Sequence, residues 1–393
     1  MSAHLVDGLG TTDALAAVFS DASVLQAMLD VESALARVQG ALGLIPENAA
    51  RAIATVAGAD QFDAAALSRA ARASGTPIVP LVAALRERVA SVDAGSASFV
   101  HWGVTSQDIS DNALVMLLKR TVPLIGGTQA RIAQTLRATS NEHAGTLMAG
   151  RTLLQPAMPI TFGLKVAGWH AAIQRSWRAL QQSIDVAAVV QCGGAAGTLA
   201  GLGDKGMAVR RALAEALELH DGPSWHTDRG RLAVVAGGCG ILTGALGKMA
   251  RDVSLLMQYE VGEASEPGGG SSSMPHKRNP AGCARALAAA VRTPGLVAAY
   301  LSGLVQEHER AVGGWQAEWP TLAALLQATG AASEAMADVA DGLTVDRERM
   351  RRNMTAVGEP MLASAGAADA LRRELLACGE RTGENDKVEP DTV

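Results

Sequence analysis

The feature that most limits how this chain can fold is a series of long apolar segments that are poor in proline. They lie at about residues 108–148, 159–190, 228–262, 280–306 and 321–343, and Ala, Leu and Val dominate each of them. Each spans roughly 20–40 residues, well above the usual length of about 11–12 for a globular helix. Alternating strand patterns are almost absent. We therefore predict an all-α fold with a central, elongated bundle of long helices.

The distribution of these segments divides the chain into three parts. Residues 1–100 hold shorter helical patterns and should form an N-terminal helical domain, in which apolar spacing predicts a helix that begins near Ser23. Residues 101–344 hold the long-helix bundle. Residues 345–393 should form a short, trimmed C-terminal helical region with a polar, charged tail that is expected to be disordered.

The long helices need more packing partners than one chain offers. Residues 232–257 carry few charged side chains, so this helix should be buried on most sides. A single chain cannot easily cover so much apolar helix surface. We therefore expect an oligomer that is built on these helices.

Composition and charge argue against several classes of protein. The formal net charge of −5 does not fit a strongly basic nucleic-acid binder. The N-terminus lacks the basic start and apolar stretch of a signal peptide, and no run of about 18 purely apolar residues predicts a membrane span. The 4 cysteines are far apart and lack zinc-site spacing, so we expect reduced thiols in a cytoplasmic protein with no metal.

The most distinctive short segment is GGGSSSMPHKRNP, at residues 268–280. Glycine loses more backbone entropy on ordering than any other residue, so packing alone does not explain a Gly- and Ser-rich run that leads into cations. We favour a loop that closes over an anionic substrate. The phosphate-binding P-loop pattern is absent, and a plain solvated linker is the alternative.

Three further polar segments interrupt or follow the apolar helices. In HWGVTSQDISD, Thr105 and Ser106 stand where a long helix should begin, and the free N–H groups there suit a carboxylate, with ordinary capping as the alternative. GRTLLQPAMP, at residues 150–159, lies between two long helices, where a helix-to-helix turn is the simpler interpretation. Arg310, in EHERAVGGWQAEW, is a candidate carboxylate ligand by its fork geometry, with a solvated helix end as the alternative.

Two histidines receive no clear role from their local sequence. His101, taken alone, fits a hydrogen-bonded structural histidine. His226 lies in PSWHTDR, which is similar to a helix start capped by Thr227 or Asp228, and it has no evident partner in the sequence.

Taken together, these segments resemble the fumarase/aspartase superfamily. Its motif Gly-Ser-Ser-x-Met-Pro-x-Lys-x-Asn stands at residues 270–279, and HWGVTSQD and GRTLLQPAMP match the other two regions in order. The likeness covers about residues 10–350. Within the superfamily the chain is most similar to the 3-carboxy-cis,cis-muconate cycloisomerases, through LDVESALARVQGALGLIP, VHWGVTSQD, MAGRTLLQPAMPITFGLKVAGW and HERAVGGWQAEW.

The resemblance implies a helical three-part subunit in a homotetramer, whose central helices merge into one multi-helix core. Each active site would be shared between three subunits, and no metal or cofactor is implied. The implied reaction is a reversible intramolecular lactonisation to 4-carboxymuconolactone, by conjugate addition through an aci-carboxylate intermediate. It belongs to protocatechuate catabolism in the β-ketoadipate pathway. The substrate would be a small carboxylate, with neither nucleic acid nor membrane as a partner.

One departure from the superfamily pattern points to a particular branch. Many of its lyases carry Thr-His in the second region, where the histidine assists catalysis, whereas here Thr152 is followed by Leu153. A leaving amine or hydroxide benefits from a proton donor. A leaving carboxylate does not, because its pKa of about 4 makes the anion stable at neutral pH. Leu153 therefore favours the lactonising branch.

The resemblance also implies roles for individual residues. Ser271 would transfer the proton, with Ser272 as the fallback, and Lys277 and Asn279 would stabilise the developing charge. His101 would be a ligand or an auxiliary acid. The substrate carboxylates would be held by Thr105, Ser106, Thr152, Gln155 and, as a weaker candidate, Arg310.

Three alternatives stay open at this point. The chain could be another lyase of the superfamily, such as an adenylosuccinate lyase. It could be a cycloisomerase for a related muconate, such as a sulfonated one. It could also be a non-catalytic helical scaffold that kept the fold, and the retained motif residues speak against this.

Overall fold

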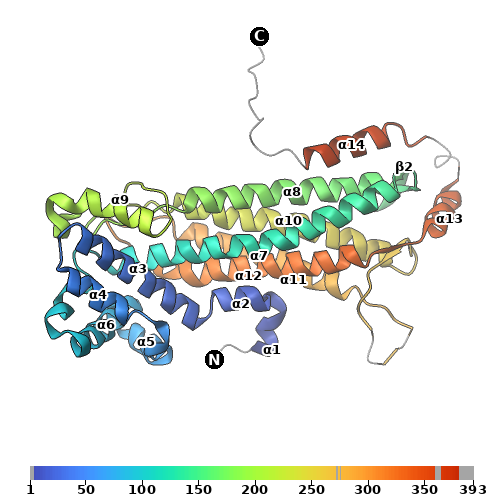
Figure 1. The fold of residues 1–393 in the computed structure, drawn as a ribbon. Coiled ribbons are helices and arrows are strands. Elements are labelled where there is room, and N and C mark those ends of the chain that lie inside the picture. Colours follow the sequence, from blue (N-terminus) through green and yellow to red (C-terminus); the bar gives the residue numbers. More distant parts are fainter. Residues whose placement is uncertain (1–3, 271–272, 275, 359–363, 380–393) are drawn as a thin grey trace, which may run out of the picture.

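Five long helices run along the molecule and pack side by side, as Figure 1 shows. The computed structural model describes residues 4–270, 273–274, 276–358 and 364–379. The five helices are α7 (Ser106–Glu142), α8 (Phe162–Ala187), α10 (Gly230–Met257), α11 (Ala281–Ser302) and α12 (Gly314–Asp341). They coincide with the five predicted segments, and the predicted all-α bundle is confirmed. The first helix is shorter at its C-terminal end than expected, and α12 begins before the predicted start at Thr321.

Shorter helices come before the bundle in the chain; those within residues 21–92 lie toward one end of it, whereas those within residues 4–18 lie alongside its middle (Figure 1). They are α1 (His4–Asp7), α2 (Asp13–Val18), α3 (Asp21–Ala41), α4 (Glu47–Thr55), α5 (Ala64–Ser74) and α6 (Ile78–Val92), with 3-10 turns at Gly8–Gly10, Ala59–Gln61 and Ala94–Phe99. The helix predicted near Ser23 is α3. It begins after Ser20, whose Oγ accepts a hydrogen bond from the amide of Ser23, as an N-cap residue should.

A β-hairpin joins α7 to α8, so the helix-to-helix turn predicted at residues 150–159 was wrong. Strand β1 (Leu147–Thr152) pairs antiparallel with β2 (Gln155–Thr161). The two-residue connection is Leu153–Leu154, with φ of 49° and 66°. Hairpin turns of this length require positive φ, and Asn or Gly normally supply it. Two leucines gave no such signal in the sequence.

The remaining elements close the two ends of the bundle. At one end lie the 3-10 turn Ala200–Lys205 and helix α9 (Gly206–Ala216). At the other end β3 (Ala264–Ser265) pairs with β4 (Thr344–Val345), and α13 (Arg347–Val357) follows. Helix α14 (Ala368–Cys378) returns along α8 (Figure 1). These last two helices form the described part of the C-terminal region, whose assignment as a separate short helical region stays a prediction. The tail predicted to be disordered, residues 379–393, lies outside the described residues from residue 380 on.

The apolar core follows the long helices. Cys192, Cys239 and Cys283 are buried, Cys378 is exposed, and all four are free thiols, as predicted. Helix α10 is long and apolar enough to cross a membrane by length and composition alone, but 56% of its most apolar window is buried inside the bundle. A core helix passes the same test, so α10 is best described as the central helix of this bundle.

One face of α10 and α11 is apolar and uncovered. Val234 and Ile241 of α10 are each 62% exposed, and Val291 of α11 is 76% exposed. Around Gly237 and Gly244 of α10, a methyl group added to the backbone would meet no atom within 4 Å. Two apolar helices therefore present a surface of small and aliphatic residues that this chain itself does not cover.

Candidate active site

The three predicted site regions lie at opposite ends of the bundle. Thr105 and Ser106 stand at the start of α7, whereas Thr152 and Gln155 belong to the hairpin beyond its other end. Helix α7 has 37 residues, so about 55 Å separates its two ends. The Gly- and Ser-rich loop lies at the hairpin's end of the molecule, as the order of helices in Figure 1 shows. One chain therefore does not bring these residues together around a small substrate.

We call the first end the polar end, defined by residues 101–112, 190–195, 224–229 and 306–318. The carboxylate of Asp108 lies at its centre and is 1% exposed. It accepts hydrogen bonds from the amides of Thr105 (3.0 Å), Gly193 (3.0 Å) and Gly194 (2.9 Å). His226 Nε2 lies 2.7 Å from the same carboxylate. Thr105 is the N-cap of α7, as predicted, and Asp108 completes this cap while it ties three chain segments together.

His226 therefore has a partner that its local sequence did not reveal. Asp108 and His226 are 118 positions apart in the chain. The predicted cap of the following helix is not formed by a side chain, since α10 begins after Arg229 without one. His226 is 4% exposed and belongs to the framework of the polar end.

A second buried cluster supports the same end. The guanidinium of Arg229 is fully buried, and it binds Asp111 (2.7 Å) and Glu318 (2.5 Å), which are themselves buried. It also lies over the ring of Trp225, 4.6 Å from the centroid. Burial raises the pKa of Glu318 above its usual value, although the hydrogen bonds and charge of Arg229 oppose that shift. Removing one charge from such a cluster would leave the others buried and unpaired.

Arg310 is held differently, by neutral oxygen atoms alone within the described residues. Its Nε donates to the Gln107 side chain (3.2 Å), and one terminal nitrogen donates to the carbonyls of Gly194 (3.2 Å) and Ala195 (3.1 Å). These contacts fix the guanidinium beside the start of α7 without neutralising it. A fixed guanidinium held by neutral oxygen atoms is suited to bind a carboxylate, and the role of Arg310 as a carboxylate ligand stays a prediction.

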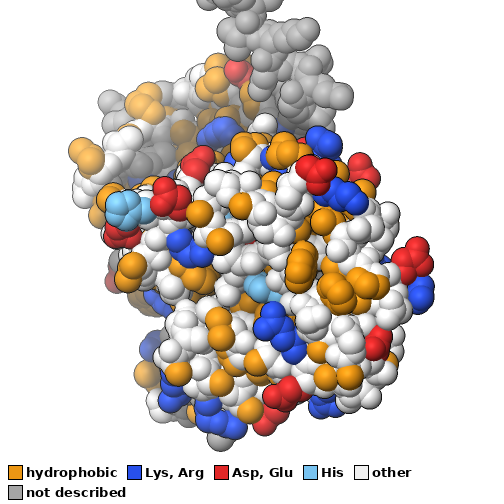
Figure 2. Space-filling view, turned by 90° about the vertical axis from the view of Figure 1, so that its left-hand side faces the viewer, with side chains coloured by type: hydrophobic (Ala, Val, Ile, Leu, Met, Phe, Trp, Pro, Cys, Tyr) orange, Lys and Arg blue, Asp and Glu red, His pale blue; other side chains and the backbone are white. Residues whose placement is uncertain are grey.

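His101 lies at the same end and is paired with a buried carboxylate. Its Nδ1 is 2.6 Å from Glu32 Oε1, and its side chain is 14% exposed. Burial lowers the pKa of His101, but the charge of Glu32 and its hydrogen bond outweigh burial, so the pKa lies above the usual value. His101 therefore keeps its second ring proton to a higher pH than an ordinary histidine does. Figure 2 shows this end of the molecule from outside, where charged side chains of both signs alternate with apolar ones.

We call the opposite end the hairpin end, defined by residues 145–161, 257–280 and 344–357. Arg151 forms a bidentate pair with Glu263 (2.9 and 2.7 Å), and the amide of Asn353 also donates to Glu263 (2.8 Å). Glu263 is fully buried, so this pair joins the hairpin to the root of the loop. Of the polar residues in this segment, Arg151 is structural, whereas Thr152 and Gln155 are exposed.

The described part of the Gly- and Ser-rich loop shows how its C-terminal half is held. Gly269 has φ of 87°, and any side chain there would overlap the carbonyl of Asn279. The backbone N–H of Asn279 donates to the carbonyl of Gly269 (2.5 Å), so the two ends of the loop are hydrogen-bonded to each other. Lys277 lines a cavity of about 920 Å³ with His276, Arg278 and Arg347. Ser271 and Ser272, the predicted proton-transfer residue and its fallback, lie outside the described residues.

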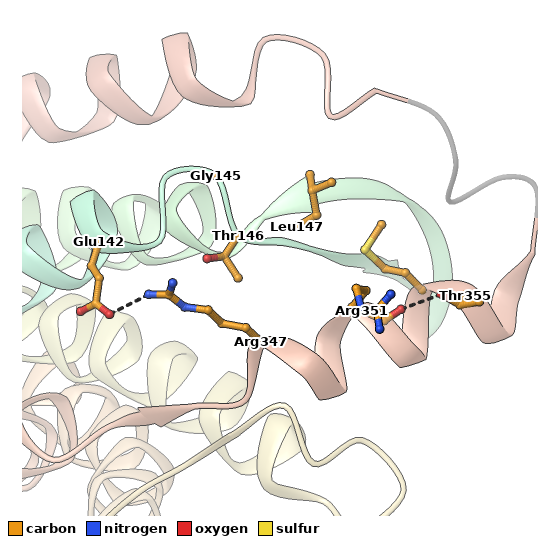
Figure 3. Close-up of a pocket in the computed structure, with 8 residues that line it drawn as sticks. Glu142, Gly145, Thr146, Leu147, Arg347, Arg351 and Thr355 are labelled. Atoms are coloured by element: carbon orange, nitrogen blue, oxygen red, sulfur yellow. Dashed lines mark hydrogen bonds and ion pairs between the residues drawn. The ribbon is translucent and has the colours of Figure 1, made fainter.

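A second cavity of about 580 Å³ lies between the base of the hairpin and α13. Figure 3 shows the ion pair of Glu142 and Arg347 (2.8 Å) across it. Thr146 and Leu147 form its hairpin side and Arg351 part of its α13 side. Among the described residues, no predicted site residue lines this cavity.

The two ends offer complementary chemistry. The polar end presents His101, Arg310 and the N-terminus of a long helix, all of which attract anions. The hairpin end presents Lys277 and Asn279 of the Gly- and Ser-rich loop. Among the described residues, no group of three or more His, Cys, Asp or Glu side chains could hold a metal ion. The arrangement is suited to binding carboxylates and to stabilising developing negative charge.

Comparison with known proteins identifies similar chains. The sequence profile of the lyase family matches residues 9–295. A 3-carboxy-cis,cis-muconate cycloisomerase of Bradyrhizobium diazoefficiens is 45% identical over 379 residues, which are 95% of this chain and 82% of that protein. A nitrosuccinate lyase of Streptomyces davaonensis is 40% identical, over 90% of this chain and 77% of that protein. The crystal structure of the 3-carboxy-cis,cis-muconate lactonizing enzyme from Pseudomonas putida aligns with a TM-score of 0.85 and 40% identity, covering 96% of this chain and 87% of that one.

Proposed function

The chain belongs to the lyase family of the fumarase/aspartase superfamily, and from this membership we propose that it lactonises 3-carboxy-cis,cis-muconate to 4-carboxymuconolactone. The reaction is an intramolecular, reversible addition within a tricarboxylate. The enzyme is thus a cycloisomerase of aromatic catabolism, and a cytoplasmic location suits that role.

The observation that carries this choice within the superfamily is the hairpin tip. Leu153 occupies the position at which many of the superfamily's lyases have a histidine, and its side chain is 96% exposed in the single chain. Such a tip cannot protonate a leaving group. It suits a reaction whose leaving group, in the lactone-opening direction, is a carboxylate that departs as a stable anion.

In the forward direction, one carboxylate oxygen of the substrate attacks the carbon β to another carboxylate and forms the C–O bond of the lactone. The electron pair of the double bond moves into that second carboxylate, which becomes an aci-carboxylate. Lys277 and Asn279 stabilise the added charge. Ser271 then delivers a proton to the α-carbon, and in the reverse direction it removes that proton, with Ser272 as the fallback.

The remaining substrate carboxylates are bound by groups from both ends of the bundle. Arg310, His101, Thr105 and Ser106 act from the polar end, and Thr152 and Gln155 act from the hairpin end. Because a helix of about 55 Å separates them in one chain, each site takes these ends from different subunits. The uncovered apolar face of α10 and α11 supports a homotetramer in which these helices meet. The chemistry itself requires only proton transfer and charge stabilisation, without a metal or cofactor.

The deciding experiment is an assay of the purified protein on 3-carboxy-cis,cis-muconate, followed by the loss of its ultraviolet absorbance. We expect turnover on this substrate and none on adenylosuccinate. Faster turnover of a sulfonated muconate than of 3-carboxy-cis,cis-muconate would instead identify a cycloisomerase for that related substrate. Absence of turnover on every muconate, with the helix content and assembly intact, would contradict the proposal.

Elimination of nitrite from nitrosuccinate is a second candidate, because one similar protein is a nitrosuccinate lyase. Nitrite, like a carboxylate, leaves as a stable anion, so the absence of a histidine at Leu153 does not separate the two reactions. Formation of fumarate from nitrosuccinate, compared with lactone formation at equal enzyme concentration, decides between them. Efficient fumarate formation without lactonisation would replace the proposed function.

A further inference from the structure

Glu32 is a buried carboxylate that no step of the proposed reaction uses. It lies in the middle of α3, where its neighbours Val31, Ser33 and Ala34 are also buried, and it is 1% exposed itself. An ionised carboxylate in such a place is costly unless a partner compensates it. The hydrogen-bond partner found for Glu32 is Nδ1 of His101, at 2.6 Å.

The backbone of His101 is also held in an unusual conformation. Its φ is 63°, in the left-handed region that non-glycine residues rarely adopt. Gly103, two residues on, has φ of 73° and packs closely against Leu202 and the carbonyl of Gly201. The surrounding structure therefore imposes this conformation, and strained residues of this kind concentrate at functional sites. Here it directs the ring of His101 onto Glu32.

The pairing leaves one ring nitrogen available. Because Nδ1 faces Glu32, Nε2 lies on the opposite edge of the ring, and within the described part of the chain it has no hydrogen-bond partner. The side chain is 14% exposed, whereas Glu32 is sealed inside. A histidine that donates Nδ1–H to a carboxylate has a fixed orientation and can donate Nε2–H to a ligand.

The charged groups around His101 come from three helices. Glu32 of α3 and Asp108 of α7 both raise the pKa of the imidazole, and Arg86 of α6 lowers it. Asp108 is already engaged by three amides and by His226, and Arg86 donates to the Val100 carbonyl. Glu32 is therefore the carboxylate in direct contact with the ring and the strongest of the groups that favour its protonated form.

We propose that Glu32 is a positioning residue, which accepts a hydrogen bond from Nδ1–H of His101 and so directs Nε2–H toward a carboxylate of the substrate. This inference rests on the proposed function, because it assigns the ligand of His101 to the same tricarboxylate. It makes His101 a donor to a substrate carboxylate. With Arg310 at the same end of the bundle, the polar end then has two side chains that donate to the carboxylates that do not react.

The first test measures the protonation of His101 without any substrate. Glu32→Gln keeps the size of the side chain and an oxygen that can accept from Nδ1–H, but it removes the charge. By nuclear magnetic resonance of labelled histidine, with His101→Asn used for assignment, we expect the pKa of His101 to fall by about 1–3 units. Asp30→Asn, two residues earlier on α3 and in a half-exposed pair with Arg120, is the matched control and should leave that pKa unchanged. An unchanged pKa in Glu32→Gln would overturn the proposal.

The second test measures what the pair does for the substrate. The pH profile of kcat/KM should lose its alkaline limb at a lower pH in Glu32→Gln than in the wild type, with KM raised more than kcat is lowered. In His101→Asn, the further change Glu32→Gln should have no additional effect on this profile. An unshifted profile, or an equal shift in the His101→Asn background, would show a structural role and overturn the proposal.

If no muconate is turned over at all, the proposed function fails, whereas binding of 1,2,3-propanetricarboxylate by calorimetry still decides the inference. The affinity for this tricarboxylate should weaken as pH rises, and in Glu32→Gln the weakening should set in at a lower pH than in the wild type. An equal pH dependence in the two proteins would overturn the inference.

Discussion

The two ends of the bundle differ in how their polar groups are satisfied. At the polar end, Asp108, Asp111 and Glu318 are buried, and each is matched by several donors from distant parts of the chain. At the hairpin end, Thr152, Gln155 and Lys277 are exposed, and two leucines form the turn. The polar end is thus a finished framework for binding anions. The hairpin end presents its binding groups to the outside of the chain, where another subunit would have to complete the site.

This difference predicts where stability and chemistry reside. Changes at the polar end should cost folding free energy, because they leave buried charges unpaired. Changes to Thr152, Gln155 and Lys277 at the hairpin end should cost turnover with little effect on folding, because these side chains are exposed.

The largest effect on turnover should come from Ser271→Ala at the hairpin end. Loss of a proton-transfer group lowers rates by about 10²–10⁴-fold. The unfolding midpoint should stay at the wild-type value, because the substitution removes a single hydroxyl group and leaves the buried polar-end clusters intact. Ser302→Ala, an exposed serine of α11, is the control. Full activity of Ser271→Ala would end its assignment and leave Ser272 to be tested in the same way.

The largest effect on folding should come from Arg229→Met at the polar end. The substitution leaves Asp111 and Glu318 buried next to each other without a cation, at a cost of about 3–5 kcal/mol in the free energy of unfolding. Denaturant titration measures this loss. Arg51→Met breaks the exposed pair with Glu47 and should cost only about 0–1 kcal/mol. Similar losses in the two variants would mean that the polar end is not a preorganised framework.

The hairpin tip should respond in opposite directions in stability and activity. The double change Leu153→Asn, Leu154→Gly supplies residues that accept positive φ and should stabilise the folded chain by about 1 kcal/mol. Turnover should fall, because the apolar tip is lost from the site. Thermal unfolding and the lactonisation assay on one preparation measure both. A less stable hairpin would show that the leucine turn is not strained.

The smallest effect should be a pH-dependent contribution of His101 to stability. Its pKa is raised in the folded chain, so the contribution is fully present below the ordinary value of about 6.5 and is lost as pH rises through the raised value. The difference in unfolding midpoint between the wild type and His101→Asn should therefore shrink as pH increases. A difference that grows with pH would contradict the pairing with Glu32.

The sequence predicted the bundle well because its signals are local. Apolar segments of about 20–40 residues define the long helices, and Ser20 and Thr105 cap helices where capping rules expect them. The hairpin was missed, because Leu153 and Leu154 take a conformation that their residue types disfavour. The motif identified Lys277 and Asn279 without showing how the loop is held.

The buried polar clusters could not be predicted from sequence. Asp108 meets His226 across 118 positions, and Arg229 meets Glu318 across 89. Each residue looks like an ordinary polar residue in its own segment. The available signal was weak: Asp111 and Glu318 are charges near the starts of otherwise apolar helices. Glu32, within LDVESALA, is likewise a single charge in an apolar helix.

Complementation between two inactive variants tests most directly the claim that opposite ends of different subunits form one site. Arg310→Ala removes a polar-end group, and Lys277→Ala removes a hairpin-end group. Each variant alone should be nearly inactive. When the two are co-expressed and form mixed tetramers, about a quarter of the sites should receive both intact ends, so about a quarter of wild-type turnover should return. No recovery in tetramers shown to be mixed would contradict the account and place each site within one chain.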